Sequence, residues 1–210
     1  MALLHRADLT PSKLELLTAW LPARAWYTGP AEPALAKVGA FRFDDPAGEV
    51  GVETILVRAG DGPVLQVPLT YRGAPLAGAD RWLVGTTEHS VLGRRWVYDA
   101  TSDPVYACAL AHTILTGAAQ AVEEFEVDGV RRPRRSDVQT TAAGSSLVAE
   151  VTGIVRVDDR DPAVIATDVL DLTVFRILED DPDPAPAAPT LTATWEGIAA
   201  PRLLAYATVR

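Results

Sequence analysis

The sequence predicts an α+β fold that is mostly antiparallel sheet, with two main helices and a β-rich C-terminal half. Three observations support this class. Helix-type patterns occur in only two segments, many short apolar segments are separated by turn residues, and strands and helices do not alternate as in nucleotide-binding parallel sheets. A chain of 210 residues can bury roughly 70% of its unfolded surface, so it needs no disulfide for stability.

The first helix is expected directly after Thr10, which can serve as its N-cap, with Pro11 at the first helical position. Leucines at helical spacing form an apolar stripe, and Pro22 is expected to end the helix. The stripe indicates that this helix faces the core.

Four strands are expected between the two helices. They cover residues 35–43, 49–58, 63–71 and 91–98. Asp61-Gly62 predicts a hairpin between the second and third strands. Because proline cannot donate a hydrogen bond to a neighbouring strand, Pro68 places the third strand at a sheet edge or beside a bulge.

The second helix has clear signals at both ends. Asp103 is expected to be its N-cap, Pro104 its first residue and Gly117 its end. The helix is apolar on nearly all sides, so we expect it to be deeply packed.

Residues 118–210 are expected to form further strands and no helix. The predicted strands cover residues 120–127, 138–142, 147–157, 168–179, 191–198 and 203–209. In one of them, alternation puts Leu170, Leu172, Val174 and Arg176 on one face.

Two loops are expected in this half, an arginine-rich one at residues 131–135 and a Pro- and Asp-rich one at residues 179–189. The sequence divides into a first region, 1–117, and an acidic β-rich extension, 118–210. No linker-type segment separates the two, so we expect them to pack as one unit.

The net charge of −9 argues against a nucleic-acid partner, which would select a basic face. Residues 1–118 carry 10 basic and 12 acidic side chains, whereas residues 119–210 carry 9 and 16. Cys108 is the single cysteine, no apolar run is long enough to span a membrane, and the N-terminus does not resemble a secretion signal. We therefore expect a cytoplasmic protein without a membrane partner.

The motifs that are typical of common catalytic sites are absent from the sequence. It has no phosphate-binding loop, no dinucleotide fingerprint and no serine nucleophile elbow. His5, His89 and His112 are scattered, which makes a zinc site unexpected. We expect neither a metal nor a cofactor.

Residues 84–107 concentrate side chains that enzymes use. Neighbouring residues of a strand point to opposite faces, so Glu88 and His89 do not make a good acid–base couple, and only one of Arg94 and Arg95 can line a given surface. Two strands, a turn and a capped helix account for most of the stretch. A ligand or partner contact, and a catalytic role, remain as alternatives.

Three segments of the first half carry a family resemblance. They are LTAWLPARAWYTG, LQVPLTYRG and WVYDATSDPVYACAL. In this order they resemble the N-terminal cap domain of actinobacterial maltokinases and related glucosamine kinases, over roughly Thr10 to Gly117. The sequence departs from the family at Ala25, where the kinases often have arginine. The resemblance implies a small sheet with helices against it, which in the kinases sits on the ATP-binding lobe.

The same resemblance places the phosphotransfer residues in later lobes, which use a His-x-Asp catalytic loop and a downstream Asn. No His-x-Asp occurs in this sequence, and the chain ends at Arg210, before two kinase lobes could follow. Phosphoryl transfer depends on positioned metal and phosphate ligands. We therefore expect a cap-like protein that stands without kinase lobes and is not an enzyme.

Three functions are compatible with these observations. A regulatory or adaptor partner of a sugar kinase, or of another enzyme of glycogen and trehalose metabolism, would expose an apolar or aromatic patch and have no pocket. A module that binds a sugar or phosphorylated sugar without turnover would have a concave apolar pocket with few polar groups. An enzyme would bring Glu88, His89 and either Arg94 or Arg95 to one cavity.

The expected contact residues lie at neighbouring strand ends and loops of the nearly neutral first half. They are Tyr71, Arg72, Glu88, His89 and Arg94. Trp26, Tyr27 and Asp103 are expected to be structural anchors. For Trp26 and Tyr27, the alternative is an aromatic platform that binds sugar.

Overall fold

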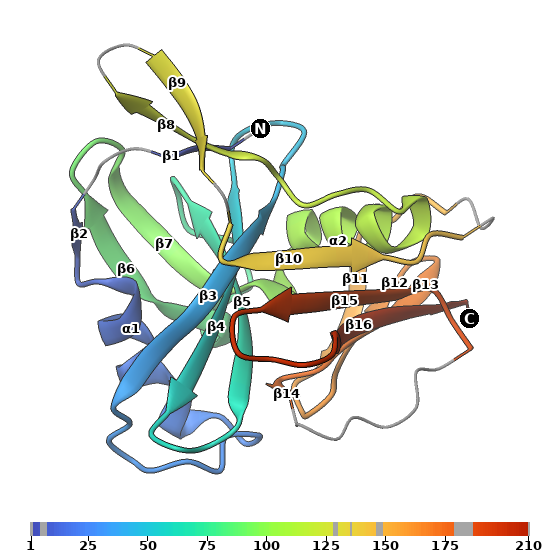
Figure 1. Cartoon of the computed structure of the whole chain (residues 1–210), viewed down its shortest axis with the longest axis horizontal. Helices are drawn as coiled ribbons and strands as arrows, with labels where there is room; N and C mark the ends of the chain where they lie inside the picture. The colour runs from blue at the N-terminus through green and yellow to red at the C-terminus, as the bar shows by residue number, and fades with distance from the viewer. Residues whose placement is uncertain are drawn as a thin grey trace.

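The computed structural model of the chain describes residues 2–4, 8–127, 130–134, 136–145, 149–178 and 187–209. This part of the chain holds three sheets and two α-helices, and its two large sheets stand next to each other (Figure 1). The mostly antiparallel architecture predicted from the sequence is confirmed. Strands dominate it more strongly than the α+β class implies.

The first large sheet has the strand order β2-β6-β7-β5-β4-β3, with β14 attached to β5, and every pairing in it is antiparallel. Its strands are β2 (Leu9–Thr10), β3 (Leu35–Phe43), β4 (Gly51–Ala59), β5 (Val64–Arg72), β6 (Leu83–His89), β7 (Gly93–Asp99) and β14 (Ile177–Leu178). Asp61-Gly62 lies in the predicted hairpin turn between β4 and β5. The strand predicted from residue 91 begins two residues later, at Gly93.

The second large sheet is formed by the second half of the chain, in the order β10-β15-β16-β13-β12-β11, and is also antiparallel throughout. Its strands are β10 (Val138–Ala142), β11 (Ile154–Asp158), β12 (Ala163–Thr167), β13 (Leu170–Val174), β15 (Thr190–Trp195) and β16 (Arg202–Val209). A third, small sheet pairs β1 (Ala2–Leu4) in parallel with β8 (Glu123–Val127), which pairs with β9 (Val130–Arg134).

Several predictions for the second half need correction. The arginine-rich segment expected to be a loop forms β9, whose register sets Arg134 opposite Glu123 of β8. Opposite charges across a strand pair favour pairing, and Pro133 is tolerated because β9 is an edge strand. Arg135 and most of the loop expected at 179–189 lie outside the described residues.

Strand boundaries in this half also differ from those predicted. Strand β12 was not predicted, because it is only five residues long and directly follows a charged turn. The strand expected over 147–157 begins only at Ile154, and the one expected over 168–179 is split into β13 and β14. The predicted apolar face is confirmed, since Leu170, Leu172 and Val174 are buried.

Helix α1 (Lys13–Trp20) begins later than predicted. Its N-cap is Ser12, not Thr10, and Ser12 and Glu15 form a capping box. Thr10 instead pairs with Glu88 at the edge of the first sheet, which holds it in a strand conformation. A short 3₁₀ turn, η1 (Leu21–Ala23), follows the helix and contains the predicted terminator Pro22.

Helix α2 (Pro104–Thr116) has the predicted ends. The Asp103 side chain accepts a hydrogen bond from the Val105 N–H, and Gly117 adopts a left-handed conformation with a φ of 74°. That conformation suits glycine because it has no Cβ to clash with the preceding turn. The helix is largely buried, as predicted, and it contacts β10, β15 and β16 of the second sheet.

Pro68 occupies a place that differs from both predicted alternatives. Strand β5 lies inside the sheet, and no register shift marks its pairing with β4. The Gln66 N–H donates to the Arg176 carbonyl on the side away from β4, and alternation puts the Pro68 nitrogen on that same side. On that side of β5, β14 pairs only with residues 64–65 and β7 pairs only with residues 69–72. No neighbouring strand is therefore placed to accept a hydrogen bond from the backbone nitrogen of residue 68.

The interior consists of two main apolar clusters. One lies between α1 and the first sheet and includes Leu17, Trp20 and Val97. The larger one packs α2 among residues of both sheets, from Phe41 on β3 to Leu172 on β13. Side chains of residues 1–117 and 118–210 therefore share one continuous core.

Candidate functional site

The residues predicted to contact a ligand or partner are divided among three places. Glu88 and Arg94 face each other across the β6–β7 pair and form an ion pair of 2.6 Å, with 57% and 62% of their side chains exposed. The His89 Nδ1 accepts hydrogen bonds from the backbone N–H groups of Val91 and Leu92, so it shapes the turn between the two strands.

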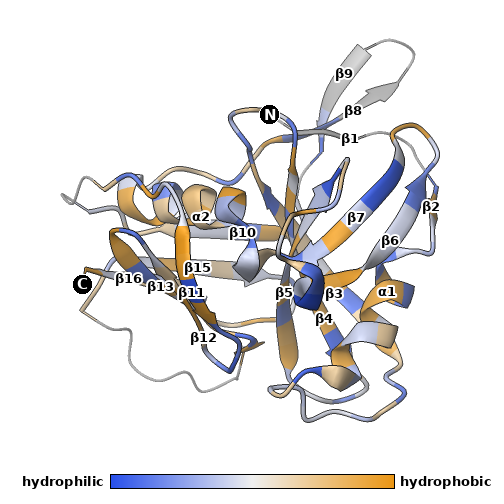
Figure 2. Cartoon of the chain, turned by 180° about the vertical axis from the view of Figure 1, so that it is seen from behind, coloured by the Kyte–Doolittle hydropathy of each residue, from blue (hydrophilic) through white to orange (hydrophobic). Residues whose placement is uncertain are grey.

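The tip of this hairpin is apolar. Val91 and Leu92 are 56% and 46% exposed, and as neighbours in the turn they form a small exposed apolar surface. The tip appears as an orange loop joining β6 and β7 in Figure 2. Glu88, His89 and Arg94 surround it, so these three predicted residues do lie together.

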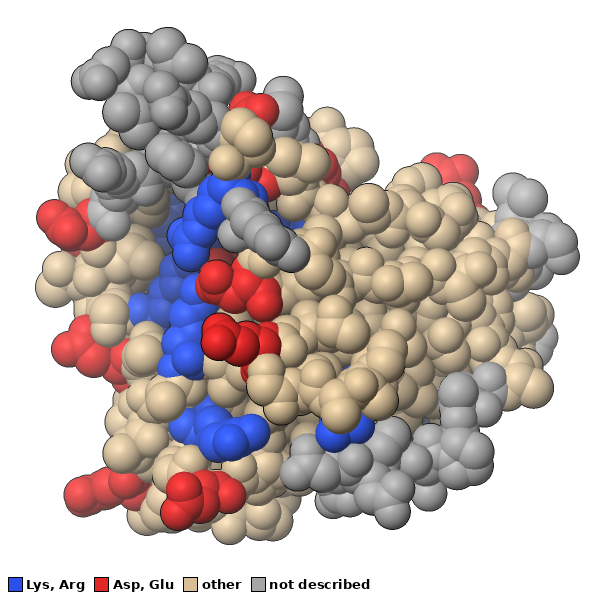
Figure 3. Space-filling view, viewed as in Figure 1, with Lys and Arg blue, Asp and Glu red and all other residues tan. Residues whose placement is uncertain are grey.

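Tyr71 belongs to a separate cluster, on the strand that pairs with β7. Its hydroxyl donates to the carboxylate of the buried Glu53 at 2.8 Å, and Glu53 also pairs with Lys13 and Arg42. Lysine and arginine side chains form a column over β3 on this face, with acidic side chains beside it (Figure 3).

The electrostatics of this cluster follow from burial and charge. Burial alone would raise the pKa of Glu53, but Arg42 and Lys13 outweigh it, and the pKa falls to about 2. Burial raises the pKa of Tyr71, and the adjacent Glu53 carboxylate raises it further. Burial lowers the pKa of Lys13 more than Glu53 raises it. The cluster is an internal charge network.

Arg72 and Asp103 also pair internally. The Arg72 Nε and Nη2 atoms donate to the two Asp103 carboxylate oxygens at 2.7 and 2.6 Å. Asp103 is fully buried at the start of α2, so this pair ties β5 to the helix that it caps. Arg72 is thus separated from the hairpin residues with which it was grouped.

Trp26 and Tyr27 pack inward. Trp26 is 5% exposed, meets Trp20 edge-on at 6.2 Å between ring centroids, and donates from Nε1 to Asp159. Tyr27 is half-buried against the same apolar cluster, and burial raises its pKa.

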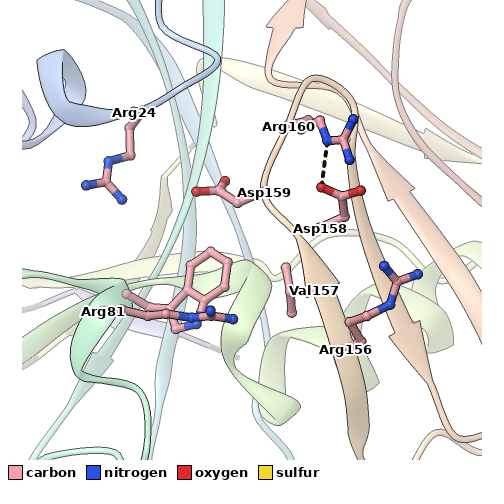
Figure 4. Close-up of a pocket in the computed structure, with 8 residues that line it drawn as sticks. Arg24, Arg81, Arg156, Val157, Asp158, Asp159 and Arg160 are labelled. Carbon is pink, nitrogen blue, oxygen red and sulfur yellow. Dashed lines mark hydrogen bonds and ion pairs between the residues drawn. The ribbon is translucent and has the colours of Figure 1, made fainter.

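A pocket of about 400 Å³ lies where the first region meets the second sheet. Its lining residues are Arg24, Arg81, Trp82, Arg156, Val157, Asp158, Asp159 and Arg160. They come from the residue after η1, from the 3₁₀ turn η2 (Asp80–Trp82), from β11 and from the β11–β12 turn (Figure 4). Charged side chains dominate, in contrast to the apolar pocket that a small-molecule module was expected to have.

Most other arginines with described side chains are paired with a carboxylate, but three of the four in this pocket are not. Arg160 pairs with Asp158 at 3.0 Å. Within the described part of the chain, Arg24, Arg81 and Arg156 form no such ion pair. Arg24 and Arg81 instead lie over the rings of Trp20 and Trp82, at 4.8 and 4.7 Å from the ring centroids.

The pocket residue Asp159 belongs to a buried network of charged side chains. Arg176 is fully buried and donates from Nη2 to Asp99 at 2.7 Å, to the Thr101 hydroxyl at 3.0 Å and to Asp159 at 3.2 Å. Its guanidinium lies 5.2 Å from the centroid of the Trp26 ring. Burial raises the pKa of Asp159 and Asp99 raises it further, against the opposing effect of Arg176.

The enzyme hypothesis required Glu88, His89 and an arginine at one cavity, and none of Glu88, His89, Arg94 and Arg95 lines this pocket. Sequence reasoning also missed the residues that do line it. The one local signal was RVDDRDP, residues 156–162, in which charges of both signs crowd a turn.

Two further properties concern the described residues. No group of three His, Cys, Asp or Glu side chains is placed there to hold a metal ion. No helix in this part of the chain has the length and apolar character needed to cross a membrane.

The fold and the pocket define a sheet-based module with a charged junction site. Residues 20–103 match the family model described as the maltokinase N-terminal cap domain, which confirms the resemblance over the elements from η1 to η3. The matched part supplies Arg24, Arg81 and Trp82 to the pocket, whereas the remaining lining residues follow it in the chain. A search of curated proteins finds no match to the chain.

Proposed function

We propose that the protein is a non-catalytic, cap-type module that acts as a regulatory or adaptor partner of a sugar kinase or a related enzyme of glycogen and trehalose metabolism. The observation that carries the proposal is the match of residues 20–103 to a domain named for a sugar kinase. The chain carries no phosphate-binding loop and no His-x-Asp motif, so the part of such an enzyme that it resembles is not the part that transfers phosphate.

The β6–β7 hairpin is the surface that we assign to the partner. It lies within the matched region, and its apolar tip, Val91 and Leu92, is surrounded by the charged side chains of Glu88 and Arg94. An apolar centre with a polar rim is the usual composition of a protein interface. The first half of the chain is also nearly neutral, so it repels acidic partners less than the second half does.

Binding to a purified sugar kinase of the same cell, measured by isothermal titration calorimetry, tests the proposal. We expect saturable binding that weakens by at least about tenfold when Val91 and Leu92 are both changed to serine, because the interface loses its apolar centre. Val155→Ser is the matched control, since Val155 is 67% exposed on β11, outside the matched region.

A parallel assay follows phosphate transfer from ATP to maltose, glucose and glucosamine. The chain alone is expected to transfer none. Robust transfer by the chain alone, or a folded chain that binds no such kinase, would contradict the proposed function.

A further inference from the structure

We propose that the arginine-lined pocket at the junction of η2 and the β11–β12 turn binds a phosphorylated sugar, with arginines holding the phosphate and aspartates accepting hydrogen bonds from sugar hydroxyls. The proposal does not depend on the partner assigned above, because the pocket and the β6–β7 hairpin tip share no residue.

The charge of the pocket is opposite to that of the chain. Four arginines and two aspartates line the pocket, so the lining has a net charge of +2, whereas the chain has a net charge of −9. Guanidinium groups match phosphate oxygens in geometry as well as in charge, which makes arginine the usual residue for binding phosphate.

Two of these arginines are held in place before any ligand arrives. Arg24 and Arg81 stack over Trp20 and Trp82, and stacking uses the face of a guanidinium while its N–H donors lie in the plane. The Arg24 Nε is buried and has no hydrogen-bond partner among the described residues, so a ligand would reach Arg24 through its terminal N–H groups. Preorganised donors without acceptors indicate an anionic ligand.

The aspartates narrow the choice of anion. The two hydrogen bonds that Asp159 accepts, from the Trp26 Nε1 and the Arg176 Nη2, both reach its Oδ1 atom. From the described residues Oδ2 accepts none, so it can accept a hydrogen bond from a ligand hydroxyl. A pair of carboxylates repels a polyphosphate or nucleic acid, whereas a ligand with one phosphate and several hydroxyls suits both kinds of lining residue.

The size of the pocket agrees with this class of ligand. Its volume of about 400 Å³ lies in the lower part of the roughly 300–1,000 Å³ range of small-molecule sites. A ligand there would contact the matched region through Arg24 and Arg81 and the second sheet through Arg156 and Asp158. Binding should therefore also stabilise the junction between the two halves.

The test is isothermal titration of the full chain with four probes: glucose 1-phosphate, glucose 6-phosphate, glucose and inorganic phosphate. We expect at least one sugar phosphate to bind more tightly than both glucose and inorganic phosphate, and to raise the melting temperature. Arg81→Gln combined with Arg156→Gln should weaken that binding by at least about tenfold, because each exposed arginine supplies charge-assisted hydrogen bonds.

Arg58→Gln is the matched control, since Arg58 is exposed at the end of β4 and does not line the pocket. Asp158→Asn should weaken sugar phosphate more than inorganic phosphate. Equal affinity for inorganic phosphate and the sugar phosphates would overturn the sugar assignment. Absence of binding by either sugar phosphate to the folded chain, or equal loss of binding in Arg58→Gln, would overturn the site itself.

Discussion

At the scale of single residues, Trp26 makes three kinds of contact, two of which reach the second half of the chain. Its ring packs on Trp20, its Nε1 donates to Asp159, and the Arg176 guanidinium lies over its face. We expect Trp26→Ala to lower the free energy of unfolding by about 3–5 kcal/mol, as large aromatic truncations in cores do. Urea denaturation measures this, with the exposed Val91→Ala as a control. An unchanged midpoint would argue for a surface role of Trp26.

Glu53 makes stability depend on pH at the acidic end. Its pKa is about 2 in the folded chain against an ordinary 4.5, so its stabilising effect is complete above pH 4.5 and is lost as the pH falls towards 2. That shift corresponds to roughly 3 kcal/mol. Glu53→Gln should be less stable at neutral pH, because Arg42 and Lys13 lose their buried partner, and it should lose less further stability on acidification.

Free energies of unfolding in urea at pH 7 and pH 3, for the wild type and this variant, provide the measurement. Glu88→Gln is the control, because the exposed Glu88–Arg94 pair is expected to contribute less than about 1 kcal/mol. If the wild type and Glu53→Gln lose the same free energy of unfolding between pH 7 and pH 3, Glu53 is not the group responsible for the acid sensitivity.

At the scale of elements, the sequence predicted best where the signals are local. Both ends of α2 follow from Asp103, Pro104 and Gly117, since capping and the left-handed terminus depend on adjacent backbone alone. The start of α1 was misplaced because Thr10, a good cap by type, is held in a strand by its pairing with a distant residue. Where a segment pairs with a residue far along the chain, that pairing determines its conformation and overrides local propensity.

For the same reason, the pocket could not be predicted from local sequence signals. Arg24, Arg81 and Asp159 lie on turns that come together only when the first region docks on the second sheet. The sequence shows that each is charged and near a turn, but not that the three share a surface. The β6–β7 hairpin was easier to predict, because Glu88 and Arg94 are brought together by a short turn.

At the scale of the whole molecule, we expect residues 1–117 and 118–210 to unfold together. They share the core around α2, where Phe41 of the first sheet and Leu172 of the second belong to one apolar cluster. The buried Arg176 bonds to Asp99 from across the boundary, and separating the halves would leave these charges without partners. Limited proteolysis distinguishes this arrangement from two tethered domains.

The first cleavage by a protease specific for acidic residues is expected within residues 179–189, where the sequence predicts an acidic, proline-rich loop. The fragments should stay associated under native conditions, because β15 and β16, which follow that segment, pair with β10 and β13, which precede it. Gel filtration should therefore show one species after cleavage, and thermal unfolding of the uncut chain should show one transition. Early release of an intact fragment ending near residue 117 would mean that the cap-like region folds by itself and that the acidic half is an appended domain.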